Sequence, residues 1–302
     1  MKPNSTVIVS ASLTKNYGKH RGIDSVNLEV KPGEVFGYLG PNGAGKTTTI
    51  RILLDFIRPT HGSVSIFGLD SRRGSIEVRR RTGYLPGEQS LYGNLTGHEL
   101  LDFVANLRGG VDRQYVAHMA KRLDCDLTRH IRTLSHGNRQ KVGLIQAFMH
   151  QPELIILDEP TAGLDPLVQQ EFYHLVAEAK AAGRTIFLSS HILPEVERVC
   201  DRVGIIREGK LVAVETVETL KSRAVRRLEI HFARAVPQTG FAAIAGVRDV
   251  VVQNGVLTCT VIGSLDALVK AAAQFEVTNI VSHEPSLEEV FLTYYGENAK
   301  YA

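Results

Sequence analysis

The fold of this chain is decided by one glycine-rich stretch, Gly40-Pro41-Asn42-Gly43-Ala44-Gly45-Lys46-Thr47-Thr48. A short apolar run at residues 35–39 precedes it, and an apolar-periodic helix through Ile57 follows it, stopped by Pro59. Between a strand and a helix, such glycines let backbone N–H groups turn inward around phosphates, and the helix N-terminus adds a positive dipole. Lys46 would reach the β- and γ-phosphates, and the Thr47 hydroxyl would bind Mg²⁺. The stretch therefore predicts nucleotide binding.

A second polar pair follows another buried strand. Four apolar residues at 154–157 lead directly into Asp158 and Glu159. In open α/β sheets, ligands bind at the carboxyl ends of the strands. Asp158 is therefore expected to hold Mg²⁺, and Glu159 to act as general base toward the attacking water. An isolated Asp-Glu pair in this place could instead be a polar cap on a buried strand. The phosphate-binding stretch elsewhere in the chain makes that structural interpretation the weaker one.

The order of strands and helices indicates an α/β fold. Strand-like runs at residues 6–13, 24–30, 154–157 and 185–189 alternate with helical segments, among them an Arg-rich helix near 75–81 and two helices within 96–124. Alternation of this kind favours a largely parallel sheet covered on both faces. We expect an α/β domain of the P-loop type over residues 1–221.

The pattern changes near Ser222. Four short strand-like runs and two helical stretches then occur in the order β-α-β-β-α-β, with Asn254-Gly255 as a hairpin turn and a last helix expected at 286–295. Residues 222–302 are therefore expected to form a small α+β domain of the split-βαβ type.

The composition of the chain limits the classes of protein to which it can belong. Of 302 residues, 43% are hydrophobic and 22% charged, and Lys+Arg 35 against Asp+Glu 32 leaves a net charge of +3. That charge is too small to indicate nucleic-acid binding, and the arginine runs 72–73 and 79–81 lack interleaved aromatic residues, so a solvated helix face is expected there. The three cysteines lack metal or disulfide spacing, which favours a reducing compartment. No signal peptide or membrane-spanning segment is predicted.

Further motifs carry a resemblance to a known family. Leu134-Ser135-His136-Gly137-Asn138 resembles the signature sequence of ATP-binding-cassette (ABC) proteins, and 40–48 and 154–159 match the Walker A and Walker B motifs of that family. Tyr17 matches the aromatic residue that stacks on adenine, residues 162–165 match the D-loop, which ends at Asp165, and Ser190-His191 matches the H-loop. The resemblance covers about residues 5–220 and implies the fold of a P-loop nucleoside-triphosphatase cassette, with a mixed, largely parallel sheet and a helical subdomain. Residues after 222 are similar, less closely, to the accessory domain of ABC-2-type exporter ATPases.

The resemblance implies a composite site in a head-to-tail dimer of cassettes. Each ATP would lie between the P-loop of one cassette and the signature of the other, where Ser135 would donate to the γ-phosphate and Gly137 would allow close approach. His191 would contact the γ-phosphate near the water activated by Glu159. Two positions of the signature depart from the family, because His136 replaces glycine and Asn138 replaces glutamine.

The glutamine loop departs further. Gly87 occupies the position where the family has glutamine, and Glu88 and Gln89 follow it. Either polar residue, or neither, could approach Mg²⁺ or the attacking water. Glu88 is the candidate for an additional ligand, and the alternative is a solvated loop residue. The segment from Gly87 to Thr96 would form the surface that couples the cassette to a permease.

We therefore expect an ATPase subunit that uses ATP and Mg²⁺ to power export. Its partners would be a second cassette, identical or different, and a separate transmembrane permease, which would place it at the cytoplasmic face of the cell membrane. An ABC ATPase acting on nucleic acid or the ribosome is the alternative, but the segment between Lys46 and Ser135 is too short for the coiled-coil or zinc insertion of such relatives. A P-loop small-molecule kinase would explain neither the signature nor His191.

Overall fold

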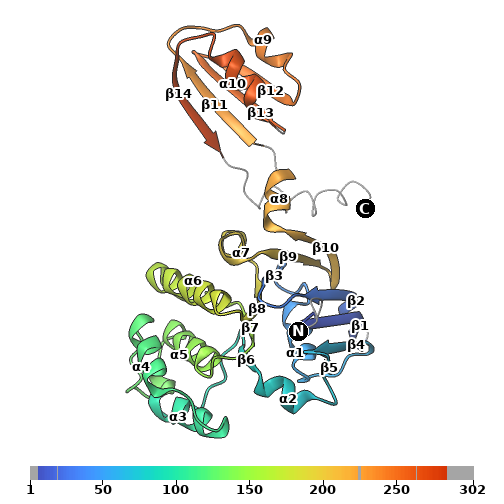
Figure 1. The fold of residues 1–302 in the computed structure, drawn as a ribbon, viewed down its shortest axis with the longest axis vertical. Helices are drawn as coiled ribbons and strands as arrows, with labels where there is room; N and C mark the ends of the chain where they lie inside the picture. The colour runs from blue at the N-terminus through green and yellow to red at the C-terminus, as the bar shows by residue number, and fades with distance from the viewer. Residues whose placement is uncertain (1–5, 19, 224–225, 263, 284–302) are drawn as a thin grey trace. The chain divides into compact units, whose positions relative to one another are not determined.

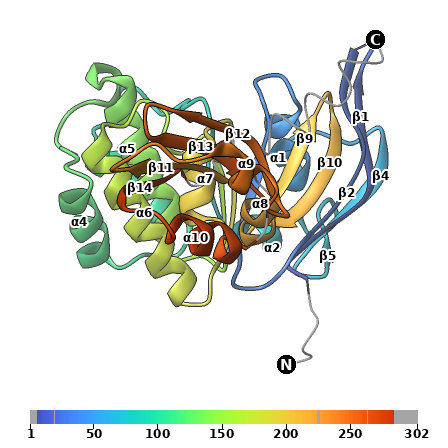
Figure 2. The ribbon, with the colours of Figure 1, turned by 90° about the horizontal axis from the view of Figure 1, so that it is seen from above.

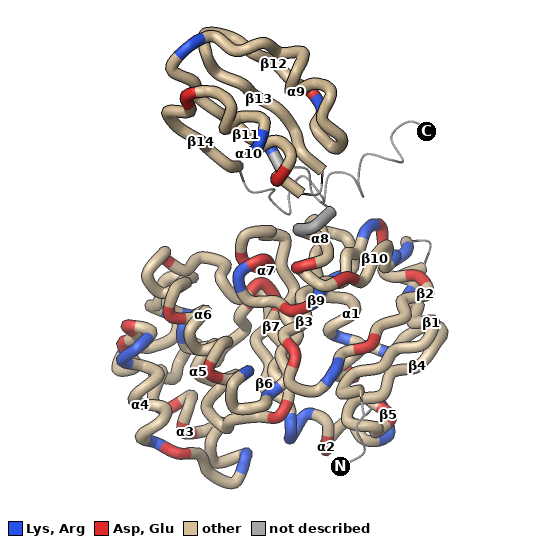
Figure 3. Tube along the Cα trace, turned by 45° about the horizontal axis from the view of Figure 1, so that its top comes forward, with Lys and Arg blue, Asp and Glu red and all other residues tan. Residues whose placement is uncertain are grey.

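The computed structural model of the chain describes residues 6–18, 20–223, 226–262 and 264–283. The chain divides into two units, Met1–Glu215 and Thr216–Ala302 (Figure 1). In the part described, no helix is long and apolar enough to cross a membrane. Basic and acidic residues are interspersed along the described chain (Figure 3), and the predicted arginine runs engage in local contacts, such as the two hydrogen bonds of Arg81 with Glu153.

A six-stranded sheet forms the centre of the first unit, in the strand order β10-β9-β3-β8-β7-β6. Its three middle strands, β3 (Val35–Leu39), β8 (Thr185–Ser190) and β7 (Leu154–Asp158), are buried along their whole length, as the uninterrupted apolar runs predicted. They pair in parallel, and β6 (Thr82–Leu85) and β9 (Arg202–Arg207) extend the parallel pairing on either side.

The register of these strands aligns their polar ends. Leu39, the last residue before the phosphate-binding stretch, pairs with Ser190, and Asp158 pairs with Ser189. The carboxyl ends of β3, β7 and β8 therefore meet at one edge, which is where ligands bind in open parallel sheets.

A second sheet packs against the first through α1 (Lys46–Leu53). It has the order β2-β1-β4-β5 with antiparallel pairs: β1 (Ile8–Tyr17) lies between β2 (His20–Val30) and β4 (His61–Ile66), and β5 (Leu69–Asp70) follows β4. Ile50 and Leu53 of α1 are fully buried in one cluster with Ile8 of the second sheet and Phe36 of the first. The helix that starts at the phosphate-binding stretch is thus fixed between two sheets.

Helices cover the other side of the central sheet. In Figures 1 and 2 the helices α3 to α6 gather opposite β1, β2 and β4. Their bounds are α3 Gly97–Leu107, α4 Arg113–Arg122, α5 His136–Phe148 and α6 Pro166–Ala181. Thr96 and Glu99 form a capping box at the start of α3. The two predicted helices within 96–124 are confirmed, and α2 (Ser75–Arg80) matches the predicted Arg-rich helix.

Two features of the first unit differ from the prediction. The strands β9 and β10 (Lys210–Thr216) were not predicted, since their turn, Glu208-Gly209, lies in a charged stretch; both turn residues have positive φ, 49° and 78°. Helix α1 ends at Leu53 and not at Ile57, because Asp55 adopts a left-handed conformation with φ 58°.

The second unit has the predicted element order. Strands β11 (Arg226–Phe232), β12 (Val247–Gln253), β13 (Val256–Val261) and β14 (Val277–His283) alternate with helices α9 (Gln238–Ala242) and α10 (Asp266–Ala272), and α8 (Val217–Arg223) precedes them. The sheet order is β12-β13-β11-β14 with antiparallel pairs, which confirms the split-βαβ topology. The helix predicted at 286–295 lies outside the described residues.

Candidate nucleotide-binding site

The glycine-rich stretch forms a tight loop between β3 and α1. Gly43 and Gly45 have φ of 80° and 107°, a region that side chains with a Cβ rarely adopt. An ideal Cβ on Gly45 would lie 2.6 Å from the Ile23 side chain and 2.8 Å from the Gly22 carbonyl oxygen. Only glycine therefore fits this close approach of the loop to β2.

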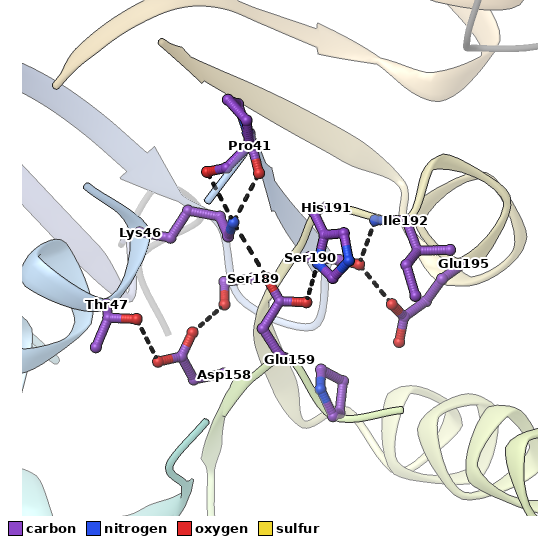
Figure 4. Close-up of polar contacts among 12 residues, drawn as sticks. Pro41, Lys46, Thr47, Asp158, Glu159, Ser189, Ser190, His191, Ile192 and Glu195 are labelled. Carbon is purple, nitrogen blue, oxygen red and sulfur yellow. Dashed lines mark hydrogen bonds and ion pairs between the residues drawn. The ribbon is translucent and has the colours of Figure 1, made fainter. Parts of the chain in front are cut away.

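Lys46 is the first residue of α1 and is held inside the loop. Its Nζ donates to the Gly40 carbonyl oxygen at 2.6 Å and to the Pro41 carbonyl oxygen at 3.2 Å, and lies 3.1 Å from Glu159 Oε1 (Figure 4). The side chain is 6% exposed. A buried ammonium group is therefore fixed where the sequence predicted contact with phosphates.

Thr47 and Asp158 meet at the carboxyl end of β7. The Thr47 hydroxyl donates to Asp158 Oδ2 at 2.8 Å, and the Ser189 hydroxyl donates to Asp158 Oδ1 (Figure 4). Carboxylate and hydroxyl oxygens are the ligands that Mg²⁺ prefers, and they face the loop that would hold phosphate oxygens. The donor set of this structure fits a magnesium ion bound together with nucleotide phosphates.

Glu159 follows Asp158 in a left-handed conformation with φ 50°, which turns its side chain back toward Lys46. Its Oε2 lies 2.7 Å from His191 Nδ1 (Figure 4). On the backbone side, the buried Gln140 side chain donates to the carbonyl oxygens of Glu159 at 3.2 Å and Pro160 at 3.1 Å. The carboxylate is thus held between two nitrogen-bearing side chains, while Gln140 supports its strained backbone.

A cavity of about 400 Å³ lies at the phosphate-binding loop. It is lined by Tyr17, Arg21, Gly22, Pro41, Asn42, Gly43, Gly45, Lys46, Thr47, Thr48 and Glu159. Tyr17, at the end of β1, is 46% exposed and presents an aromatic surface at this cavity. The cavity therefore combines an aromatic residue, a phosphate-binding loop and a carboxylate, as the binding and hydrolysis of a nucleotide require.

Ser135, Gly137 and Asp165 do not line this cavity. Ser135 and Asp165 are exposed N-caps of α5 and α6, and Ser135 Oγ accepts a hydrogen bond from the Asn138 backbone N–H at 3.3 Å. Backbone hydrogen bonds from Val168 and Leu167 lower the pKa of Asp165. An ideal Cβ on Gly137 would lie 2.4 Å from the Gly163 carbonyl oxygen, so the signature helix contacts residues 162–165 within one chain.

The structure does not bring Glu88 to Thr47 and Asp158. Its side chain is exposed, and Gly87 instead takes the chain past Asp158, where an ideal Cβ would lie 3.3 Å from Asp158 Cγ. Gln89 turns toward α5, and its Nε2 donates to the Pro86 carbonyl oxygen at 3.1 Å and to Gln140 Oε1 at 3.3 Å. The glutamine of this loop therefore contacts the signature helix.

Sequence reasoning assigned no role to Gln140, Ser189 and Glu195, and it missed Arg21 and Gly22, which line the cavity. Ser189 lies at the carboxyl end of a predicted strand, which was a usable signal. Gln140 and Glu195 lie on helices without a spacing that would mark them, and only tertiary contacts reveal their partners.

The fold and the site together define a P-loop nucleoside triphosphatase. Comparison with known proteins narrows the class. The family model described as ABC transporter matches residues 23–162. The chain is 41% identical over 230 residues to the bacitracin transport ATP-binding protein BcrA of Bacillus licheniformis, with 75% of each chain covered.

Two further proteins extend this likeness. The linearmycin resistance ATP-binding protein LnrL of Bacillus subtilis is 31% identical over 310 residues, which covers 97% of this chain and 100% of LnrL. A solved ATP-binding subunit of an ABC transporter superposes with a TM-score of 0.66 at 33% identity, over 72% of this chain and 92% of the other. The chain belongs to the ATP-binding proteins of ABC transporters, and it is an ATPase of that family.

Proposed function

We propose that this protein is the ATPase subunit of an ABC exporter, in which two cassettes close on ATP and drive a separate transmembrane permease. One observation carries the proposal: Glu159 lies between Lys46 and His191 at the mouth of the phosphate-binding loop, beside the oxygen pair of Thr47 and Asp158. That arrangement supports hydrolysis in addition to binding.

In the proposed hydrolysis, the backbone of residues 40–48 and the Lys46 ammonium bind the β- and γ-phosphates. Glu159 accepts a proton from the attacking water while the water oxygen bonds to the γ-phosphorus and the bond to the bridging oxygen breaks. His191 holds Glu159 at 2.7 Å and is placed to contact the γ-phosphate. Tyr17 stacks on the adenine, as its exposure at the cavity allows.

Thr47 and Asp158 would hold Mg²⁺, Thr47 through its hydroxyl and Asp158 through its carboxylate. The ion would neutralise charge on the phosphate oxygens during transfer. Glu88 is not included in this ligand set, because its side chain is exposed and makes no contact with either residue among those described.

The dimer is proposed from the place of the signature. Ser135 and Gly137 are absent from the residues that line the nucleotide cavity of their own chain, and Ser135 is exposed at the N-terminus of the 13-residue helix α5. Its hydroxyl accepts one backbone hydrogen bond and keeps its proton for a phosphate of the partner's ATP. Asp165, an exposed N-cap of α6, would lie in the same interface.

Coupling to the permease is proposed for the segment from Gly87 to Thr96 and the neighbouring face of α3. Tyr92 and Phe103 are 65% and 44% exposed and pack edge to face at 5.9 Å, and Leu107 is 72% exposed. Such apolar exposure fits a surface covered by a partner. The protein would then lie at the cytoplasmic face of the membrane through its permease.

Export is the proposed direction, since BcrA is named for bacitracin transport and LnrL for linearmycin resistance. Substrate choice is assigned to the permease. Residues 222–302 are proposed to be an accessory domain, which the full-length match to LnrL supports.

Reconstitution tests the proposal. The chain is purified with the hydrophobic protein encoded next to it and placed in proteoliposomes. We expect ATP-dependent transport that is lost with Glu159→Gln in the same permease. ATPase activity that neither requires nor responds to any adjacent membrane protein would contradict a transporter function.

A further inference from the structure

A buried carboxyl group lies behind the proposed hydrolytic site. Glu195, in α7 (Leu193–Val199), is 1% exposed, and its Oε2 accepts a hydrogen bond from Ser190 Oγ at 2.5 Å (Figure 4). In the described part of the chain, its Oε1 has no partner of ordinary hydrogen-bond geometry. Burying a carboxyl group with an incompletely hydrogen-bonded oxygen costs stability, so the presence of this residue calls for an explanation beyond packing.

The contacts of Glu195 join the two segments that carry Glu159 and His191. Ser190 Oγ donates to Glu195 and accepts from the Ile192 backbone N–H at 2.9 Å, which fixes the backbone on both sides of His191 (Figure 4). On the other side, the Thr161 hydroxyl, two residues beyond Glu159, interacts with the same carboxyl group. Glu195 therefore interacts both with the end of β8 and with the turn after β7.

We propose that Glu195 is a positioning residue for hydrolysis, which holds the His191 backbone so that the imidazole meets Glu159. The inference rests on the proposed function, because it assigns Glu195 to the residues that this function uses. Glu195 touches neither the nucleotide cavity nor the metal-binding pair; it acts through Ser190 and His191.

The ionisable groups around Glu195 agree with this role. Burial is the largest cause that raises its pKa, to about 7; the hydroxyls of Ser190 and Thr161 oppose it, and the Glu159 charge adds to it. Glu195 in turn raises the pKa of Tyr173 on α6 and of Cys200 after α7, in both cases less than burial does. The carboxyl group is thus close enough to Glu159 to sense its charge.

Three variants test the inference: Glu195→Ala, Glu195→Gln and Ser190→Ala, each with steady-state ATPase and nucleotide-binding measurements. For Glu195→Ala and Ser190→Ala we expect kcat to fall about tenfold, since small displacements at a reacting centre cost one to two orders of magnitude. KM for ATP and nucleotide affinity should change less than about twofold. Glu195→Gln keeps an acceptor for Ser190 and should retain most of kcat.

A double-mutant cycle with His191→Ala separates positioning from general structural support. If Glu195 acts through His191, Glu195→Ala should lower kcat by less than about twofold in the His191→Ala background. Glu34→Ala is the matched control: Glu34 is also a buried carboxylate of this unit, paired with Arg202 at 3.0 Å, and that substitution should leave kcat unchanged.

Equal losses of kcat for Glu195→Ala with and without His191 would overturn the inference, as would an unchanged kcat in Glu195→Ala. If Glu195→Ala does not fold, kcat is compared for Ser190→Ala and Glu195→Gln, each with His191 present and with His191→Ala. A loss of kcat in Ser190→Ala that is equal with and without His191 would then overturn the inference. A wild-type rate for His191→Ala alone would contradict the proposed function instead, so the two failures are distinguishable.

Discussion

Lys46 Nζ lies 3.1 Å from Glu159 Oε1, which joins the phosphate-binding loop directly to the proposed general base. The ammonium group has two further bonds to loop carbonyl oxygens, and Glu159 has a second partner in His191. A γ-phosphate would compete with Glu159 for Lys46, because both are anions within reach of one cation. Binding of the substrate and release of the base are thus coupled at one ion pair.

Replacement of Glu159 by glutamine should separate binding from hydrolysis. In Glu159→Gln the phosphate-binding loop stays intact but the water loses its base, so we expect kcat to fall by about 10²–10⁴-fold with ATP affinity retained. Size-exclusion chromatography with ATP should show a stabilised dimer. Glu153→Gln, which alters an exposed carboxylate paired with Arg81, serves as control. Turnover near the wild-type rate would remove Glu159 from its role.

The proposed composite site predicts complementation between two inactive variants. Ser135→Arg should block hydrolysis and leave nucleotide binding by the monomer unchanged, since Ser135 lies outside the cavity of its own chain. Mixed with Lys46→Ala, it should regain part of the ATPase activity, because one of the two hybrid sites is then intact. Weakened ATP binding by monomeric Ser135→Arg would instead indicate that the signature is a local structural helix.

Magnesium dependence distinguishes Thr47 from Glu88. Thr47→Ala removes the hydroxyl that contacts Asp158 at 2.8 Å, and we expect it to raise the Mg²⁺ concentration for half-maximal ATPase several-fold. Glu88→Ala should leave the titration unchanged, because the Glu88 side chain is exposed. A several-fold shift in Glu88→Ala would restore Glu88 as a ligand and require the loop to move.

The raised pKa of Glu195, about 7, predicts a pH-dependent stability. In the unfolded chain this carboxyl titrates near 4.3, so between roughly pH 4.3 and 7 the folded state binds the extra proton and the free energy of unfolding falls as the pH rises. Glu195→Gln does not titrate. The free energy of unfolding of Glu195→Gln, relative to that of the wild type, should therefore increase by on the order of 2 kcal/mol from pH 5 to pH 8.

Urea unfolding of both proteins at several pH values measures this difference. Glu153→Gln is again the control. Arg81 lowers the pKa of Glu153, so this carboxylate is ionised in both the folded and the unfolded protein above about pH 6. A constant stability difference between wild type and Glu195→Gln across the range would mean that Glu195 is ionised in the fold.

The contact between the signature helix and the D-loop predicts that adding a methyl group at Gly137 lowers kcat. An ideal Cβ on Gly137 would lie 2.4 Å from the Gly163 carbonyl oxygen, which is backbone and cannot rotate away. Gly137→Ala should therefore displace residues 162–165 and lower kcat at least several-fold. Gly240→Ala, with open space around its Cβ in the second unit, should leave the ATPase rate unchanged. Equal rates for both variants would show that the D-loop tolerates the shift.

The sequence predicted those features of the fold that depend on residues close together in the chain. Apolar runs predicted β3 and β7, and Thr47 and Asp158, which lie beyond the end of β3 and at the end of β7, meet because parallel strands align their carboxyl ends at one edge of the sheet. Asn254-Gly255 predicted the hairpin of the second unit, where both residues have positive φ. In each case the signal lies within a few residues of the feature.

What the sequence did not predict depends on distant contacts. Gln140 and Glu195 are buried polar residues on helices, and their roles follow from partners at Glu159 and Ser190 that no spacing reveals. The close approach of Gly87 to Asp158 likewise depends on a distant contact, which no local pattern indicates. Such residues gain their role only from the assembled fold.

The two units have separate cores, one around Ile50 and Phe36 and one around Phe241 and Leu257. For a chain built in this way we expect two cooperative melting events, which calorimetry would register individually. Nucleotide binding adds its free energy only to the core that shapes the nucleotide cavity. If ATP also raises the temperature of the second melting event, the stabilities of the two units are coupled. The stability of residues 222–302 would then depend on whether nucleotide is bound.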